Sequence, residues 1–233
     1  MKICFVGLDG SGKSTQSNIL VKDLKEKKID VVYRHQFRYE SDTVMSAKDK
    51  LRPLIKRMQY LICIPDSILI ESKILRFIRD NLFWKMIRLF IAYPIGLIVL
   101  YSGLIKARGK SKLYGNHEYF VMDRCFLDEL ARVEWKLNIR IPLKSIWFHF
   151  APAPDLTFYF DIPGQTSWGR MDPVDTGLDA MILKEKTYKR LIPNYDKYSD
   201  MNVLNTESCD IKEVTKLVYS VLREKDDNLN SIL

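Results

Sequence analysis

Cysteine and histidine are scarce in this chain, and their scarcity excludes several kinds of site. The cysteines are Cys4, Cys63, Cys125 and Cys209, which lie far apart and form no Cys-x-x-Cys pair. A disulfide framework or a metal cluster is therefore not expected, and a reducing, cytoplasmic compartment fits this cysteine usage. The three histidines are also far apart and show no metal-ligand spacing.

A membrane-spanning helix needs about 20 consecutive apolar residues, and the chain also lacks an apolar run of that length. Residues 89–105 are almost wholly apolar, but this run is shorter and contains Pro94, Gly96 and Gly103. We interpret it as a helix of the core or of a dimer interface. The alternative is a peripheral membrane contact through residues 84–108, where aromatic and basic residues accompany the apolar ones.

A block of basic residues with interleaved aromatic side chains is missing as well. The 37 basic and 29 acidic residues give a net charge of +8, but the basic residues are scattered along the chain. Nucleic acid is therefore not expected as a partner. The positive excess suits a small anionic ligand or an anionic membrane surface instead.

What the chain does contain fits a single α/β domain over residues 1–233, since this length is enough for one large domain. Short apolar runs that end in glycine or a polar residue predict five strands, at 3–6, 29–33, 119–122, 156–160 and 203–204. A helix beginning at Lys13 separates the first two. This strand–helix–strand opening predicts a parallel sheet with helices on both faces.

The stretch between the second and third predicted strands is long and mostly helical in pattern. It contains Pro53, Pro65 and Pro94, so we expect several helices that together form an insertion over residues 40–112. In open parallel sheets, ligands bind beyond the carboxyl ends of the strands. Residues 7–15, Asp123, Asp161 and Asn205 should therefore face one crevice.

The most specific pattern follows the first predicted strand. Residues 7–15 read GLDGSGKST, which satisfies the phosphate-binding pattern G-x-x-x-x-G-K-[ST]. Glycines let the backbone curl around a phosphate, and the exposed amides and the helix N-terminus then face the anion. The pattern predicts that ATP and Mg²⁺ bind at Gly7, Asp9, Gly10, Ser11, Gly12, Lys13, Ser14 and Thr15.

Three residues at the end of this loop have separate expected tasks. Lys13 would place its charge on the β- and γ-phosphates. Ser14 would offer its hydroxyl to Mg²⁺, and Thr15 would continue the helix beside the α-phosphate. Glycines and hydroxyl groups at this spacing therefore predict a P-loop nucleotide site in an α/β P-loop fold.

A second candidate site lies at the end of the third predicted strand, where Asp123 is followed by Arg124. An aspartate in this place can hold Mg²⁺ or orient an acceptor. The neighbouring arginine can bind a phosphate with two N–H groups. Beside a P-loop, this pair points to phosphoryl transfer.

The motifs together resemble those of the thymidylate kinase family. The resemblance rests on GLDGSGKST at 7–15, on FVMDRCF at 120–126 and on PDLTFYFDIP at 154–163, and it covers residues 40–112 poorly. It implies a five-stranded P-loop kinase that transfers the γ-phosphoryl group of ATP to a nucleoside monophosphate, with dTMP favoured. It also implies a homodimer.

The resemblance further implies roles for single residues. Asp9 would contact the sugar hydroxyl of the acceptor, and Arg124 would bind its phosphate. Asp123 would lie near Mg²⁺ and the transferring group. Arg170 falls in a mobile lid over residues 164–178, where it would neutralise the transferring phosphoryl group. Asn205 would approach the adenine.

Two segments depart from the family pattern. The turn expected after the second strand is replaced by YRHQFR at 33–38, where Arg34 and Arg38 could still bind an acceptor phosphate. Residues 127–132 read LDELAR and lack the expected base-reading side chains. Two alternatives therefore stay open: a kinase of this fold for a nucleoside, a sugar or a lipid-linked acceptor, or a membrane-associated nucleotide-binding protein without kinase activity.

Overall fold

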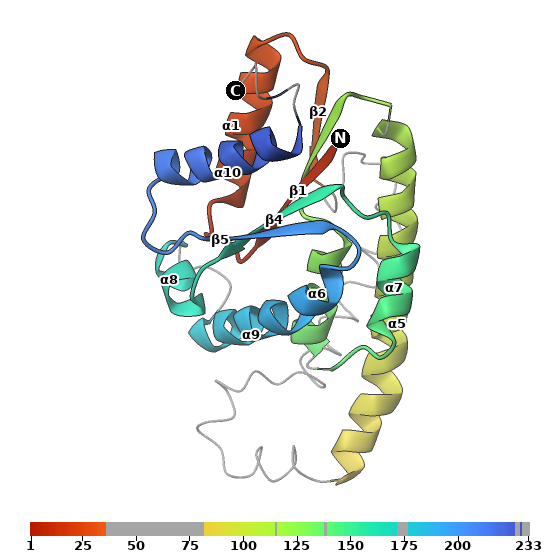
Figure 1. The fold of residues 1–233 in the computed structure, drawn as a ribbon. Helices are drawn as coiled ribbons and strands as arrows, with labels where there is room; N and C mark the ends of the chain where they lie inside the picture. The colour runs from red at the N-terminus through yellow and green to blue at the C-terminus, as the bar shows by residue number, and fades with distance from the viewer. Residues whose placement is uncertain (36–81, 115, 138, 172–176, 227–228, 230–233) are drawn as a thin grey trace.

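A computed structural model of the chain shows five parallel strands between two layers of helices (Figure 1). It describes residues 1–35, 82–114, 116–137, 139–171, 177–226 and 229. The strands run in the order β2-β3-β1-β4-β5 and every neighbouring pair is parallel. Their bounds are β1 Lys2–Gly7, β2 Val31–His35, β3 Tyr119–Asp123, β4 Leu156–Asp161 and β5 Asp200–Asn205. The predicted α/β class with a five-stranded parallel sheet is confirmed.

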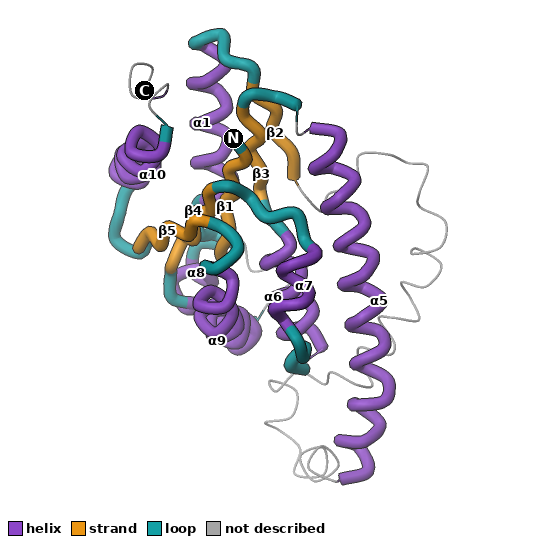
Figure 2. The backbone as a smooth tube through the Cα atoms, turned by 45° about the vertical axis from the view of Figure 1, so that its right-hand side comes forward, coloured by secondary structure: helices purple, strands orange, loops and turns teal. Residues whose placement is uncertain are grey.

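Alternation along β1 separates the two hydrophobic cores. Ile3 and Phe5 belong to one core, and Cys4 and Val6 belong to the other, since successive side chains of a strand point to opposite faces. The first core lies under α1 (Lys13–Glu26) and α10 (Ile211–Lys225). The second lies under α5 (Leu82–Tyr114), α6 (Phe126–Leu137), α7 (Lys144–Phe150) and α9 (Leu178–Tyr195). Figure 2 shows the same division around the sheet.

α5 runs without interruption through Pro94, although we expected a proline there to end a helix. This expectation was wrong for a local reason. Pro94 lies on the exposed side of α5, where water can satisfy the carbonyl group that loses its N–H partner. On the opposite side, a Cβ on Gly96 would lie 3.2 Å from Val133, and one on Gly103 would lie 3.0 Å from Glu129. Glycine therefore lets α5 approach α6 closely.

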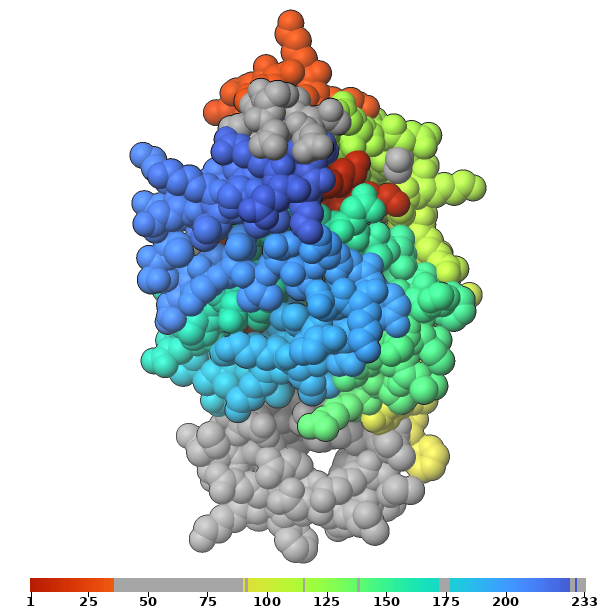
Figure 3. Space-filling view, viewed as in Figure 1, coloured from red at the N-terminus to blue at the C-terminus, as the bar shows by residue number. Residues whose placement is uncertain are grey.

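The remaining helix, α8 (Gly164–Gly169), lies within the predicted lid. In the view of Figure 3, the C-terminal third of the chain forms much of the front surface, and α5 lies along one side. None of the helices in the described ranges is long and apolar enough to cross a membrane. The predicted insertion at 40–112 lies outside the described residues up to position 81.

Candidate functional site

The loop between β1 and α1 has the backbone that the sequence pattern requires. Gly10 has a φ of 79°, and a Cβ there would come within 2.9 Å of the Ser167 carbonyl oxygen. Gly12 has a φ of 90° and is the N-cap of α1, whose first turn receives no side-chain hydrogen bond from it. Left-handed values are costly for other residues. The uncapped amides of α1 are therefore available to an anion.

Lys13 lies folded back over this loop. Its Nζ donates a hydrogen bond to the Leu8 carbonyl oxygen at 2.8 Å and lies 3.6 Å from Asp9 Oδ1. Burial, together with the nearby charge of Arg124, lowers the pKa of Lys13. The Ser11 hydroxyl beside it is buried and has no hydrogen-bond partner. Both groups could therefore gain favourable contacts from a bound phosphate.

Asp123 and Ser14 meet at the carboxyl ends of β3 and β1. Ser14 Oγ donates to Asp123 Oδ2 at 2.6 Å, and the Tyr33 hydroxyl donates to the same oxygen at 3.4 Å. Asp123 Oδ1 is buried without a hydrogen-bond partner, which is costly for a carboxylate. An acidic oxygen in need of a partner next to a hydroxyl fits Mg²⁺, which prefers one or two carboxylates and takes its other ligands from phosphate and water.

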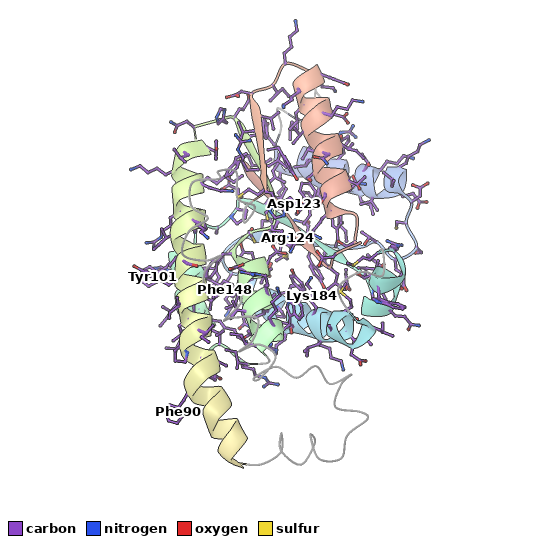
Figure 4. The ribbon with its side chains drawn as sticks, turned by 180° about the vertical axis from the view of Figure 1, so that it is seen from behind. Phe90, Tyr101, Asp123, Arg124, Phe148 and Lys184 are labelled. Atoms are coloured by element: carbon purple, nitrogen blue, oxygen red, sulfur yellow. The ribbon has the colours of Figure 1, made fainter. Side chains whose placement is uncertain are left out.

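Asp9 lies at the centre of a group of cations. Its Oδ1 pairs with Arg124 and its Oδ2 with Lys184, and Lys13 is the third positive neighbour. Burial works against ionisation of Asp9, but Lys184, Arg124 and Lys13 outweigh it and hold the pKa of Asp9 well below its usual range. Figure 4 shows Asp123, Arg124 and Lys184 together in the middle of the molecule.

Arg124 is held in an uncommon backbone conformation. Its φ is 78°, although it is not glycine, and its amide donates to the Phe5 carbonyl oxygen at 3.0 Å. Just beyond it, Asp128 accepts from the Cys125 amide at 2.9 Å and from the Tyr188 hydroxyl at 2.6 Å. Strained residues that neighbouring contacts hold in place are typical of functional sites. Asp9 attracts Arg124 strongly enough to raise the pKa of Arg124 despite its burial.

Lys184 is a site residue that sequence reasoning missed. Basic side chains on an amphipathic helix usually form a solvated face, but Lys184 is only 5% exposed. Helical spacing could have found it. Met181 precedes it by three residues and Tyr188 follows it by four, and both belong to the buried face of α9.

The side chains of four other predicted site residues contact other groups or are exposed. Arg170 donates to the carbonyl oxygens of Thr206, at 3.2 and 3.3 Å, and of Glu207, at 2.6 Å. Asn205 is exposed and accepts from the Glu207 amide, and Thr15 is also exposed. The Arg34 guanidinium lies 4.8 Å from the centre of the Tyr114 ring. Arg38 lies outside the described residues.

Comparison with known proteins supports the fold. No family model matches the chain, and no curated protein does. Two solved structures of deoxyadenosine kinase from M. mycoides are similar, one with bound dATP and one with the products dCMP and a flexible dCDP. Each has 16% sequence identity and a TM-score of 0.54, and the match covers 96% of this chain and 100% of that chain. The chain has the P-loop kinase fold.

The charge cluster leads to a prediction for Asp9→Asn. At neutral pH, this change should lower the free energy of unfolding by about 2 kcal/mol, because three cations lose their shared carboxylate. The pKa of Asp9 is depressed in the folded protein, so its stabilising effect is present above the ordinary value of 3.8 and is lost as the pH falls below it. Urea unfolding of both proteins between neutral pH and about pH 3 would measure this.

The exposed Asp196 provides a control for this experiment. Asp196→Asn should change the free energy of unfolding little at any of these pH values. A difference between wild type and Asp9→Asn that stays constant down to about pH 3 would contradict the expected ionisation of Asp9.

Proposed function

We propose that this protein is an ATP- and Mg²⁺-dependent kinase that phosphorylates a nucleoside monophosphate, with dTMP favoured. One observation carries the proposal. The phosphate-binding loop, the Ser14–Asp123 contact and the Arg124–Asp9 pair all lie at the carboxyl ends of adjacent strands. Phosphoryl transfer needs positioned charge at such a place and little covalent chemistry from the protein.

The donor side of the proposed reaction uses the loop. The triphosphate of ATP would lie on the amides of α1, and Lys13 would exchange the Leu8 carbonyl oxygen for phosphate oxygens. Ser14 and Asp123 would hold Mg²⁺. When bound, the ion would offset the charge on the phosphates.

The acceptor side uses the cations that now surround Asp9. Arg124 and Lys184 would exchange the Asp9 carboxylate for the phosphate of the acceptor, which has the same charge sign and similar oxygen geometry. Asp9 would then be available to accept a hydrogen bond from the sugar. An acceptor phosphate oxygen attacks the γ-phosphorus of ATP, and ADP leaves with the electrons of the broken bond. Arg170 on the proposed lid would approach the transferring group on closure.

A nucleoside acceptor is the second candidate. It is favoured by the names of the similar structures, which are deoxyadenosine kinases, and by the replacement of the expected turn at 33–38. In this version, a sugar hydroxyl attacks the γ-phosphorus. ADP formation from ATP and Mg²⁺ in the presence of dTMP, dUMP, other monophosphates and deoxynucleosides decides between the candidates.

The proposal expects transfer to a monophosphate, with dTMP the best. If ADP forms only with a nucleoside, the acceptor is a nucleoside and not a monophosphate, and the protein is still a kinase. If the protein binds ATP but transfers phosphate to no acceptor, the proposed kinase activity is wrong and the protein is a nucleotide-binding protein. The homodimer implied by the family resemblance is a separate part of the proposal, which sedimentation equilibrium tests.

Lys184→Met tests whether this lysine binds the acceptor phosphate. Methionine keeps the apolar stem but removes the charge. We expect kcat/KM for the acceptor to fall roughly 10- to 100-fold, mostly through KM, since one charged hydrogen bond is lost. KM for ATP should change little. The exposed Lys186 on the same helix is the matched control, and Lys186→Met should leave both constants within about twofold. If KM for the acceptor is unchanged in Lys184→Met, Lys184 does not bind the acceptor phosphate.

A further inference from the structure

α5 carries a row of exposed apolar side chains on the side that faces away from the sheet. Phe90 is 70% exposed, Ile98 69%, Tyr101 61% and Ile105 55%. Spacings of eight, three and four residues place them on one face of the helix. Figure 4 shows Phe90 and Tyr101 projecting from α5 away from the rest of the protein. A row of this kind marks an interaction surface more often than a free one.

A neighbouring segment widens this surface. The Tyr93 hydroxyl donates to the Arg140 carbonyl oxygen at 2.8 Å, and Arg108 Nε donates to the Phe150 carbonyl oxygen at 2.9 Å. The segment 139–150, which contains α7, therefore lies beside α5 over most of its length. It adds the exposed side chains Leu143, Ile146 and Phe150. We call the exposed residues of α5 and of 139–150 the outer face.

The charge of these two segments is as uneven as their polarity. α5 contains six basic residues and no acidic one, and the segment 139–150 contains two basic residues and again no acidic one. These eight positive charges equal the whole net charge of +8, so the rest of the chain is balanced. The basic residues are scattered in the sequence, and it is the absence of acidic residues that makes this part of the molecule positive.

We propose that the outer face binds to the surface of an anionic lipid bilayer. Apolar and aromatic side chains would enter the boundary between head groups and acyl chains, and basic side chains would contact the anionic head groups. The exposed Arg108 and Lys112 are well placed for the second task, because they follow Ile105 by three and seven residues on the same side of α5. Long basic side chains can reach head groups from such a position.

The charge argues for lipid and against a second copy of this chain. Two outer faces packed on one another would bring the exposed Arg108, Lys112 and Arg140 of both copies together, with no acidic residue from α5 or 139–150 to offset their charges. Like charges in contact across an interface cost several kcal/mol. An anionic bilayer instead provides the opposite charge and an apolar layer at the depth that the exposed side chains need.

Co-sedimentation with vesicles tests this proposal. We expect the full chain to sediment with vesicles of phosphatidylserine and phosphatidylcholine, and to stay in the supernatant with phosphatidylcholine alone. Added salt should weaken the binding, because part of it is electrostatic. Protein that remains in the supernatant with both kinds of vesicle would overturn the proposal.

Matched variants show whether the outer face is responsible. Ile105→Glu, at a residue that is 55% exposed, should lower the vesicle partition coefficient at least roughly tenfold. Ile211→Glu on α10, at a residue that is 59% exposed and on the other side of the sheet, should change it far less. Lys112→Glu and Lys216→Glu make the same comparison for charge, and Lys216 is exposed on α10.

Several outcomes would decide against the lipid. An equal loss in the α10 variants would show general charge attraction rather than a defined face. If Ile105→Glu instead converts a dimer to a monomer in sedimentation equilibrium, with vesicle binding unchanged, a second copy covers the outer face. Ile98→Glu repeats the test at a residue that is 69% exposed, and an unchanged melting temperature with each substitution confirms that the fold persists.

Discussion

Lys13→Ala is expected to reduce phosphoryl transfer about a thousandfold. Lys13 is the residue whose ammonium lies on the phosphate-binding loop, 2.8 Å from the Leu8 carbonyl oxygen. In the proposed reaction, it offsets charge that develops on the phosphates, and alanine leaves that charge without compensation. The loss should be mainly in kcat, because the uncapped amides of α1 would still bind the triphosphate.

The loss in Lys13→Ala can be separated from unfolding. Burial already lowers the pKa of Lys13, so its charge is costly to keep in the folded protein, and alanine should not lower the melting temperature by more than a few degrees. Lys22→Ala is the matched control, because Lys22 is on the same helix with its side chain 74% exposed. Its rate should equal that of wild type. If Lys13→Ala has a rate close to that of wild type, the loop does not take part in the reaction as proposed.

Arg124→Ala should also cost roughly a thousandfold in kcat/KM for the acceptor, because one group that is proposed to bind its phosphate is removed. Arg124→Lys should restore only part of this, since lysine keeps the charge but not the planar group that contacts two oxygens at once. Steady-state kinetics with ATP and the acceptor identified by the ADP assay measure both. A Lys variant as active as wild type would show that charge alone is needed.

The backbone of Arg124 provides a second, independent measurement. Arg124→Gly and Arg124→Ala both lack the guanidinium group, so their rates should be equally low. Their stabilities should differ, because glycine adopts a φ of 78° without the cost of about 1 kcal/mol that alanine meets there. Urea unfolding measures this difference, and equal stabilities would show that the strain at Arg124 is small.

The strands and the loop between β1 and α1 were predictable because their determinants are local. β1 is a short apolar run and the loop motif after it occupies nine consecutive positions, 7–15; the ends of β3 and β5 follow from apolar runs that stop at Asp123 and Asn205. Parallel order then places the carboxyl ends at one edge. This rule brings Ser14 and Asp123, which are 109 residues apart, to the same edge, where the structure shows them in contact at 2.6 Å.

Other features depend on contacts with residues that are distant in sequence, which the local sequence pattern does not predict. Lys184 pairs with a residue 175 positions away, and only the buried face of α9 shows that it points inward. Pro94 is tolerated because its side of α5 is exposed, which depends on how α5 packs. The guanidinium of Arg170 contacts carbonyl oxygens beyond β5. The family resemblance instead implies a place for Arg170 near the transferring group.

Asp9 has a consequence for how the two substrates would bind. Its carboxylate joins Lys13, which would serve the donor side of the proposed reaction, to Arg124 and Lys184, which would serve the acceptor side, and its carbonyl oxygen accepts a hydrogen bond from Ser167 of α8. The substrate that binds first must separate some of these cations from Asp9, and the free-energy cost of that separation lowers its own affinity. The second substrate then finds its cations already released. Binding of donor and acceptor should therefore be positively cooperative, and each should raise the affinity for the other by the same factor.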